Sequence, residues 1–333
     1  MSREIPLAKA VADNAIRPFD FNTQSSTLNK DIIGLPLAKM VILILLLVIA
    51  IVFTVGWIAS LRKKSSEGIR PSPFQLMIGF LTDFFDTLGV GSFATTTSLF
   101  RLGKVVDDDK IPGTLNVGHT LPTILQAIIY INTIEIDLWT LWILIIASVV
   151  GSYLGASFVS RLPKKAIQIG MGIALLIAVS LIVAKLSGWI PSGGTSLGLT
   201  GVNLALGIAG NFIFGALMTI GVGAYAPIMI MVSLLGMNQK AAFPLMMGSC
   251  AFLMPIASFR FVRSGKYDPK AALGLTLLGL PGVAVAAWIV KELPLHYVSW
   301  LVVVVVIYTA VSMLRSATRI ETPLSTQDAG GII

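Results

Sequence analysis

Charged residues are scarce in this chain. Only 12% of its 333 residues are charged, against about 25% in a soluble domain. A soluble fold needs charged side chains on its surface, so this composition excludes an ordinary soluble enzyme and a nucleic-acid binder, despite a net charge of +8. Cysteine is scarcer still, because Cys250 stands alone and cannot form a disulfide within the chain, which excludes a disulfide-stabilised secreted domain. A polytopic membrane protein remains.

The sequence motifs of common enzymes are missing as well. The chain contains no H-E-x-x-H, no G-x-S-x-G, no Walker A motif and no G-x-G-x-x-G fingerprint. With two histidines and one cysteine, a catalytic metal site is not expected. The sequence therefore predicts no catalytic residues, no metal and no cofactor.

Long apolar runs are abundant instead. A transmembrane helix needs about 20 apolar residues, and the first such run, 37–61, is followed by three basic residues at 62–64. Because these charges follow a long run, an N-terminal transmembrane anchor is predicted rather than a cleaved signal, with a polar tail at 1–36 before it. Further apolar runs cover 74–100, 111–131, 138–160, 166–186, 201–235, 241–259, 271–290 and 296–314.

Two of these runs, 74–100 and 201–235, resemble each other. Each is interrupted by Gly-Val-Gly, at 89–91 and at 221–223, and similar residues follow in the same order at a spacing of 130 to 133 residues. This spacing predicts an internal repeat. The expected organisation is transmembrane repeat 1 at 74–186, an uncharged extracytoplasmic linker at 187–200, transmembrane repeat 2 at 201–315 and a cytoplasmic tail at 316–333.

The basic residues indicate how the repeats are oriented. If 74–100 and 201–235 each crossed the membrane once, the Lys and Arg residues after residue 61 would divide 11 inside and 8 outside. If each run folds as a hairpin of two half-helices, the division is 16 inside and 3 outside, which the positive-inside rule favours. Each repeat then has a broken-helix hairpin plus three full spans, and this odd number of elements inverts the second repeat.

The predicted fold is therefore an all-α polytopic protein of the inner (cytoplasmic) cell membrane, with two inverted repeats and an extra N-terminal transmembrane helix. The N-terminus is expected outside and the C-terminus inside. The basic residues expected on the cytoplasmic face are Arg62, Lys63, Lys64, Arg161, Lys164, Lys165, Arg260, Arg263, Lys266, Lys270, Arg315 and Arg319.

Broken helices also point to a binding site. The second half of a broken helix begins with unpaired backbone N–H groups, which attract an anion together with the helix dipole. Inverted repeats bring two such breaks together near the membrane centre, in a small neutral pocket suited to a compact oxyanion. The alternative is that the glycines only allow close helix packing. The candidate substrate-binding residues are Gly89, Gly91, Ser92, Thr95, Thr96, Asn116, His119, Gly221, Gly223, Tyr225 and Ser249.

Two carboxylates fall inside an apolar run. Asp83 and Asp86 share one helix face, and buried carboxylates in a membrane are costly and usually functional. Together with His119, which can relay a proton, they are the predicted residues for coupling to H+ or Na+. Repeat 2 has Gly215 and Met218 at the positions of the two carboxylates, so coupling would be one-sided.

Purely structural alternatives stay open for these residues. The two carboxylates could lie near the cytoplasmic interface and pair with a nearby basic residue, Arg70, Arg101 or Lys104. A lone histidine could equally be satisfied by a backbone carbonyl.

The broken segments resemble those of the TauE/SafE sulfite exporter family of membrane permeases. The relevant stretches are 78–91 and 215–227, supported by the basic loop before a full span and by the closing Leu-Pro dipeptides. The resemblance covers about 73–315, so the tail and the first anchor are expected to lie outside the common core. It implies export, and sometimes import, of sulfite or small organosulfur anions such as sulfoacetate. The family's usual run of glycines reads Gly91-Ser92-Phe93 and Gly223-Ala224-Tyr225 here, which makes the pocket bulkier and richer in hydroxyls.

The sequence thus predicts a secondary active transporter, acting as an exporter, of a small sulfur-containing anion such as sulfite or a short organosulfonate. Transport is expected to be proton-coupled and to proceed by alternating access of the two repeats. The alternatives are a passive anion channel, a permease for a small carboxylate, and a membrane scaffold without transport. The expected partners are the anion, H+ or Na+ and the lipid bilayer; a homodimer is left open, and no nucleic acid is expected.

Overall fold

The computed structural model describes residues 37–64, 69–189, 193–221, 223–288 and 295–318. These residues form α-helices and one short 3-10 helix and contain no β-strand, which confirms the all-α prediction. The predicted N-terminal tail and residues 319–333 of the predicted C-terminal tail fall outside the described residues, whereas residues 316–318 belong to the last helix. The helices are α3 (Leu37–Lys64), α4 (Pro73–Thr87), α5 (Ser92–Leu102), α6 (Ile111–Thr133), α7 (Leu138–Val159), α8 (Lys164–Leu186), α9 (Gly201–Met218), α10 (Tyr225–Leu234), η1 (Gln239–Ala241), α11 (Ala242–Ser264), α12 (Pro269–Trp288) and α13 (Leu295–Thr318).

Within the described chain, six helices are long and apolar enough to cross a membrane: α3, α7, α8, α9, α11 and α12. The polar helix α6 is as long as α11, at 23 residues, and residues 111–120 along it are all buried. Its polar side chains therefore face protein rather than lipid. These features confirm a multi-pass membrane protein.

The two interrupted segments fold as hairpins, as the charge distribution predicts. Phe74, at the start of α4, lies beside Gly103, just after the end of α5, because a Cβ atom at Gly103 would be 2.5 Å from the Phe74 ring. In the second segment, Asn203 near the start of α9 donates to the carbonyl of Leu235 after α10, at 3.3 Å. With 15 and 11 residues, α4 and α5 are about 22 and 16 Å long, shorter than the roughly 30 Å hydrocarbon core.

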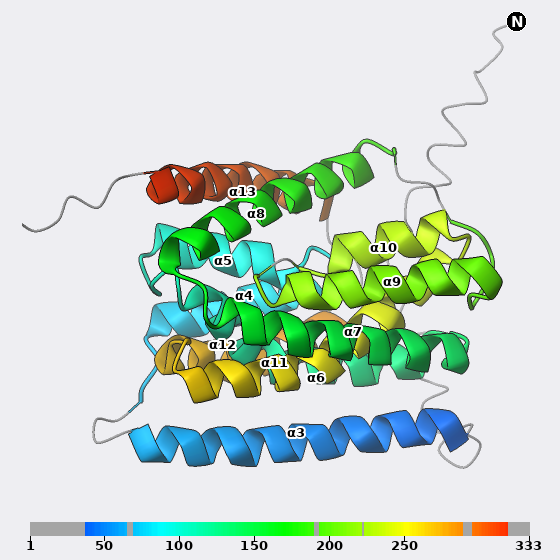
Figure 1. Ribbon diagram of the computed structural model, residues 1–333, viewed down its shortest axis with the longest axis horizontal. Helices are drawn as coiled ribbons and strands as arrows, with labels where there is room; N and C mark the ends of the chain where they lie inside the picture. The colour runs from blue at the N-terminus through cyan, green and yellow to red at the C-terminus, as the bar shows by residue number, and fades with distance from the viewer. Residues whose placement is uncertain (1–36, 65–68, 190–192, 222, 289–294, 319–333) are drawn as a thin grey trace, which may run out of the picture.

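The packing partners follow the repeat. Helix α4 packs on α12 and α9 packs on α7, while α6 and α11 pair with each other, as do α8 and α13 (Figure 1). Exchanging α4–α8 for α9–α13 reproduces the same pairs, as an internal repeat requires. The opposite orientation of the repeats across a bilayer stays a prediction.

Equivalent helix caps support the same correspondence. Asp137 precedes α7, and its carboxylate accepts from the backbone N–H of Thr140 at 2.7 Å. Asp268 precedes α12 and accepts from the N–H of Ala271 at 2.8 Å. Such caps satisfy one of the N–H groups left free at a helix start, so the same residue type begins the same helix in both halves.

Glycines allow the two equivalent helix pairs to pack closely. A Cβ atom at Gly79 of α4 would lie 2.6 Å from the carbonyl oxygen of Gly274 in α12. A Cβ at Gly151 of α7 would lie 2.0 Å from the carbonyl oxygen of Phe212 in α9. Only glycine fits at such separations, which is the packing role that small residues have in membrane helices.

One end of the bundle gathers basic segments. Arg101 at the end of α5 forms an ion pair with Asp108 at 3.1 Å and donates to Ser316 near the end of α13 at 2.9 Å. Lys266, between α11 and α12, pairs with Asp109 at 2.9 Å. We call this the basic end; the predicted cytoplasmic charges between α7 and α8 share it, on the left of Figure 1. Which side of a membrane it faces stays a prediction.

The opposite end carries the linker between the repeats. Its residue Gly194 donates to the carbonyl of Met237, just after α10, at 3.0 Å. Helix α8 runs from the basic end, where Gln168 contacts Asp108 at 2.7 Å, to this linker. The two hairpins therefore open at opposite ends of the bundle.

Helix α3 lies along the outer edge of the central pair α6 and α11, at the bottom of Figure 1. Ile42, Leu46 and Trp57 are buried against the bundle, and Lys39 donates to the carbonyl of Asn132 at 3.1 Å. Most of its other apolar side chains are exposed, as a helix that faces lipid requires. This helix is the predicted N-terminal anchor.

Candidate functional site

The helix breaks have the backbone geometry that glycine favours. Gly89 and Gly91, between α4 and α5, have φ angles of 93° and 94°. Gly221, after α9, has a φ angle of 103°. Residues with a Cβ atom are strained in this region. The glycines therefore end one half-helix and allow the next to start in a new direction.

The two breaks meet at a small internal cavity of about 30 Å³. Gly91 and Gly223 both line it, and a Cβ atom at Gly223 would lie 3.7 Å from the Cβ of Phe93. A buried water needs about 10–15 Å³ of such space, so the cavity has room for about two or three waters. The complete lining is Asp86, Gly91, Ser92, Phe93, Thr123, Met218, Gly223, Ala224, Met246, Met247 and Cys250.

The cavity has two chemically different walls. Asp86, Ser92 and Thr123 supply a carboxylate and two hydroxyls, while α9 and α11 contribute the sulfur atoms of three methionines and Cys250. No Lys, Arg or His side chain belongs to the described lining. Positive polarity comes only from the starts of α5 and α10, whose first backbone N–H groups have no partner within their own helices.

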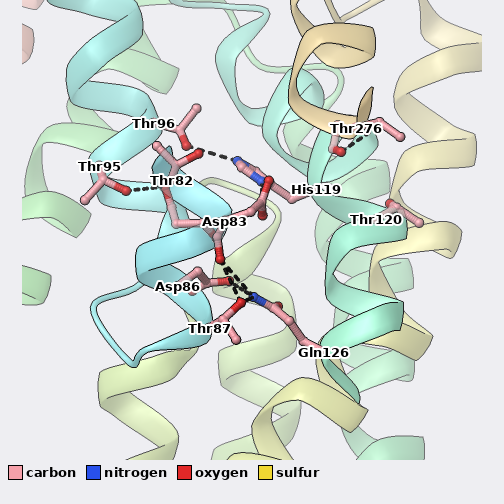
Figure 2. A network of polar contacts seen from close by, with 12 residues as sticks. Thr82, Asp83, Asp86, Thr87, Thr95, Thr96, His119, Thr120, Gln126 and Thr276 are labelled. Carbon is pink, nitrogen blue, oxygen red and sulfur yellow. Dashed lines mark hydrogen bonds and ion pairs between the residues drawn. The ribbon is translucent and has the colours of Figure 1, made fainter. Parts of the chain in front are cut away.

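Next to the cavity lies a buried chain of polar contacts from α4 through α6 to α5. Asp83 Oδ1 is 2.8 Å from His119 Nδ1, and His119 Nε2 is 3.0 Å from Thr96 Oγ1 (Figure 2). All three residues are fully buried. With Nδ1–H donating to the carboxylate, Nε2 accepts from the threonine hydroxyl in a neutral ring and donates to it in a charged one. Both contacts therefore survive a change in the ring's protonation.

A second set of contacts holds the last turn of α4. The amide of Gln126, in α6, donates to Asp86 Oδ2 at 3.2 Å and to Thr87 Oγ1 at 2.9 Å (Figure 2). One turn further along α6, the Tyr130 hydroxyl donates to the carbonyl of Thr87. These contacts fix the position of Asp86 at the cavity wall.

A third contact involves a backbone carbonyl of α6 that a proline leaves without its helical partner. Pro122 has no N–H group, so the carbonyl of Gly118 loses its partner within the helix. The hydroxyl of Thr276, in α12, donates to this carbonyl at 2.7 Å. The bond joins α12 to α6 at the turn that carries His119.

The structure brings only part of the predicted substrate-binding set to the cavity. Gly91, Ser92 and Gly223 line it. Thr96 and His119 lie behind Phe93, whose ring centroid is 5.9 Å from that of His119. The side chain of Tyr225 lies outside the described residues.

The other predicted residues have local partners. Thr95 donates to the carbonyl of Gly91 at 2.9 Å, and Asn116 donates to the carbonyl of Pro112 at 2.8 Å. Gly89 and Gly221 form the turns at the two helix breaks, with positive φ angles. Ser249 accepts from the amide of Asn211 at 3.0 Å, away from the cavity lining.

The described ionisable residues do not have the partners that the structural alternatives named. Asp83 and Asp86 are buried and contact His119 and Gln126, not a basic residue at the interface. Arg101 contacts Asp108 instead. The histidine ring contacts two side chains rather than a backbone carbonyl.

The substrate-binding and coupling residues predicted from the sequence do not include Thr123, Gln126 or Thr276. Gln126 follows His119 by seven residues, two helical turns, so helical spacing places both on one face of α6. Thr276 had no such signal, because its partner is a carbonyl freed by a distant proline.

Repeat 2 carries a neutral version of this arrangement. Ser249 occupies the position equivalent to His119, and Asn211 contacts it across α9 and α11. Gly215 occupies the position of Asp83 and packs against Ser148, where a Cβ would lie 2.1 Å from the carbonyl oxygen. Among the described residues, the buried ionisable network therefore belongs to repeat 1 alone.

A comparison with protein families found one match, to the family described as Sulfite exporter TauE/SafE, over residues 27–182 and 202–332. The match corrects the extent expected from the sequence, 73–315, because helix α3 lies within the matched region. The gap between the two matched segments coincides with the end of α8 and the linker. No curated protein and no solved structure matches the chain.

Proposed function

Because the match over most of the chain shows that the protein belongs to the TauE/SafE sulfite exporter family, we propose that it is a secondary active transporter of a small sulfur-containing anion. The substrate class is sulfite or a short organosulfonate. Transport is coupled to protons and proceeds by alternating access of two inverted repeats.

The observation that carries this proposal is the cavity where the two glycine breaks meet. Gly91 and Gly223 come from different repeats, yet both line one cavity. Substrate sites at the interface of two repeats, formed by discontinuous helices, are typical of secondary transporters. The wall of three methionines can move to admit an anion larger than water, since methionine side chains are flexible.

The contacts at the basic end support alternating access. Helix α5 runs from the cavity residue Ser92 to Arg101, which contacts both Asp108 and Ser316. Asp108 also accepts from Gln168 of α8. These contacts join α5, α8 and α13, and we propose that they form the gate between the cavity and this end. In the proposed cycle they break when the hairpin of α4 and α5 moves away from α13.

Coupling to protons is supported by the buried network of repeat 1. Asp83, His119 and Asp86 are ionisable, fully or almost fully buried, and adjacent to the cavity. Ionisable residues in this setting are costly to keep in a membrane and mark proton relays in many pumps and transporters. A passive channel has no need of them.

Transport into proteoliposomes tests the proposal. Purified protein is reconstituted, and uptake of sulfite, short sulfonates and short carboxylates is measured with and without a pH gradient. We expect uptake of a sulfur-containing anion that responds to the gradient. If none of these anions moves, the transporter proposal fails; flux that ignores the gradient and is unchanged in Asp83→Asn would favour a passive channel.

A matched pair of variants links the flux to the cavity. Gly91→Leu places a bulky side chain at a cavity residue with a φ angle of 94°, and we expect it to abolish uptake. Gly56→Leu makes the same change in α3, where no atom lies within 4 Å of an added Cβ, and uptake should persist. Equal activity of the two variants would show that transport does not depend on the cavity.

A further inference from the structure

The cavity presents a problem of charge to any anion. Its lining contains the carboxylate of Asp86 and, among the described residues, no cationic side chain. A substrate anion in this space would lie next to a negative charge in a setting of low dielectric constant, where repulsion is strong. The N–H groups at the starts of α5 and α10 carry only partial charges. Anion binding in the cavity is therefore favourable only when the Asp86 carboxylate is neutralised.

The groups around Asp86 identify where that neutralisation occurs. On α4 it faces Asp83, on α6 it faces His119 and Gln126, and on α11 the nearest titratable group is the Cys250 thiol. Helix α9 contributes the neutral side chain of Met218 to the cavity lining. The one charged residue in the described part of α12 is Lys270, at the basic end of the bundle. Helix α5 contributes the Ser92 hydroxyl.

The two carboxylates differ in their partners. Asp83 is 2.8 Å from His119, so a proton on the imidazole compensates its charge without leaving the pair. Asp86 has only neutral donors, Gln126 at 3.2 Å and the Ser92 hydroxyl. Of the two, only Asp86 lines the cavity. Charge compensation at Asp86 must therefore come from a proton on the carboxylate itself.

We propose that Asp86 carries the coupled proton, and that the anion binds only after Asp86 is protonated, so that proton and anion occupy the cavity together. This inference rests on the proposed function and deepens it. The protonated carboxyl group offers an O–H donor to the anion, beside the hydroxyls of Ser92 and Thr123. Asp83 and His119 position the adjacent turn of α4 and keep their own proton.

The proposal fixes the stoichiometry and the sense of coupling. One proton accompanies each anion in the same direction, so movement of a monovalent anion transfers no net charge. An inward proton gradient then drives uptake, and export requires an anion gradient that exceeds it. When the anion must wait for a protonated group, its apparent affinity falls about tenfold for each pH unit above the titration midpoint.

The test uses the full chain in proteoliposomes and methanesulfonate as the probe. Methanesulfonate stays ionised throughout the range from weakly acidic to weakly basic pH, whereas sulfite takes up a proton itself. A pH-sensitive dye inside the vesicles reports proton movement. In the wild type we expect one proton per anion and a KM that rises about tenfold per pH unit at the basic side of the range.

Asp86→Asn mimics the neutral carboxyl group. We expect this variant to exchange internal for external methanesulfonate at a rate independent of pH and to lose accumulation driven by a pH gradient. Asp107→Asn removes a carboxylate that is 67% exposed and pairs only with Lys110, so it serves as the matched control with wild-type coupling. Asp86→Glu retains a titratable group and should keep coupling with a shifted pH midpoint.

The outcomes separate the two proposals. Accumulation driven by a pH gradient in Asp86→Asn, or wild-type transport of methanesulfonate without proton movement, would overturn the role of Asp86 and leave the transporter proposal standing. Absence of transport of every anion by the wild type would overturn the proposed function. If Asp86→Asn does not fold, the pH midpoint of transport in Asp86→Glu decides the question, because a midpoint equal to that of the wild type would overturn the role of Asp86.

Discussion

Gly279 in α12 gives the sharpest test of the buried network, because it touches Asp83 without making a polar contact. A Cβ atom at Gly279 would lie 2.2 Å from Asp83 Oδ2 and 2.9 Å from Pro122. The Gly279→Ala variant therefore forces the carboxylate to turn away from His119, from which Oδ1 is 2.8 Å. The substitution replaces no other atom of the network, and the Pro122 ring must shift slightly as well.

The expected cost follows from the bond that is lost. A hydrogen bond to a charged group contributes about 1.5–3 kcal/mol, and replacing glycine by alanine in a helix returns about 1 kcal/mol. We therefore expect Gly279→Ala to lower the free energy of unfolding by about 0.5–2 kcal/mol, measured by denaturant unfolding in mixed micelles. Proton-coupled transport should fall as well, because the turn of α4 that carries Asp86 is displaced.

Two matched controls make this reasoning refutable. In α11, a Cβ at Gly248 would meet its nearest atoms at 3.4–3.5 Å, ordinary contact distances, so Gly248→Ala should be neutral or stabilising. In an Asp83→Ala background, Gly279→Ala should lose most of its effect, because the two residues act through one contact. Equal effects of both alanine variants, or an undiminished effect in the Asp83→Ala background, would refute the argument.

Three further predictions concern the ends and the core of the bundle. Asp108→Asn should speed the reaction of Cys250, the one cysteine of the chain, with an impermeant thiol reagent added at the basic end. Unchanged labelling would contradict a gate at this end, and the Cys250→Ala variant serves as the control for background labelling. Thr276→Val should lower the free energy of unfolding by about 1–3 kcal/mol, since it leaves the buried carbonyl of Gly118 unsatisfied; thermal unfolding in detergent checks this. Lys266→Met should change stability by less than about 1 kcal/mol, because its ion pair is partly exposed, and a larger loss would show that the loop contact matters more than its exposure implies.

The asymmetry between the repeats bears on mechanism. The shared packing partners make the two halves equivalent as scaffolds. At the positions where repeat 1 has Asp83 and His119, however, repeat 2 has Gly215 and Ser249. Repeat 2 uses close backbone packing where repeat 1 holds a carboxylate. In the proposed mechanism, the two equivalent scaffolds rock against each other while one half alone handles the coupled proton.

Local pattern was sufficient for the hairpins. Gly89, Gly91 and Gly221 adopt positive φ angles, which glycine adopts without strain. The division of basic residues favoured hairpins, in which each broken segment returns to its starting side. Helix starts were equally local, since Asp137 and Asp268 cap the helices that follow them. These features depend on interactions over a few residues or on net charge, which the sequence contains directly.

The side-chain contacts within the site join residues that are far apart in the sequence, so local pattern could not predict them. The sequence marked Asp83, Asp86 and His119 as ionisable and buried, and proposed that His119 touches the substrate. Only the packing of α4 on α6 decided that the imidazole faces Asp83, behind Phe93. The histidine and the carboxylate are 36 residues apart, so no periodicity relates their side chains.

By itself, the sequence determined that this protein is a multi-pass helical membrane protein with two related halves and a broken helix in each. Scarce charge, long apolar runs and paired glycines act through solvation and backbone sterics, which need no partner. The tertiary structure alone decided that both breaks share one cavity, that Asp86 rather than Asp83 lines it, and that Thr276 repairs the carbonyl freed by Pro122. Those outcomes depend on how closely separate helices approach each other. Glycines such as Gly79 and Gly279 set the distance between neighbouring helices, because an added Cβ atom would collide with the adjacent helix.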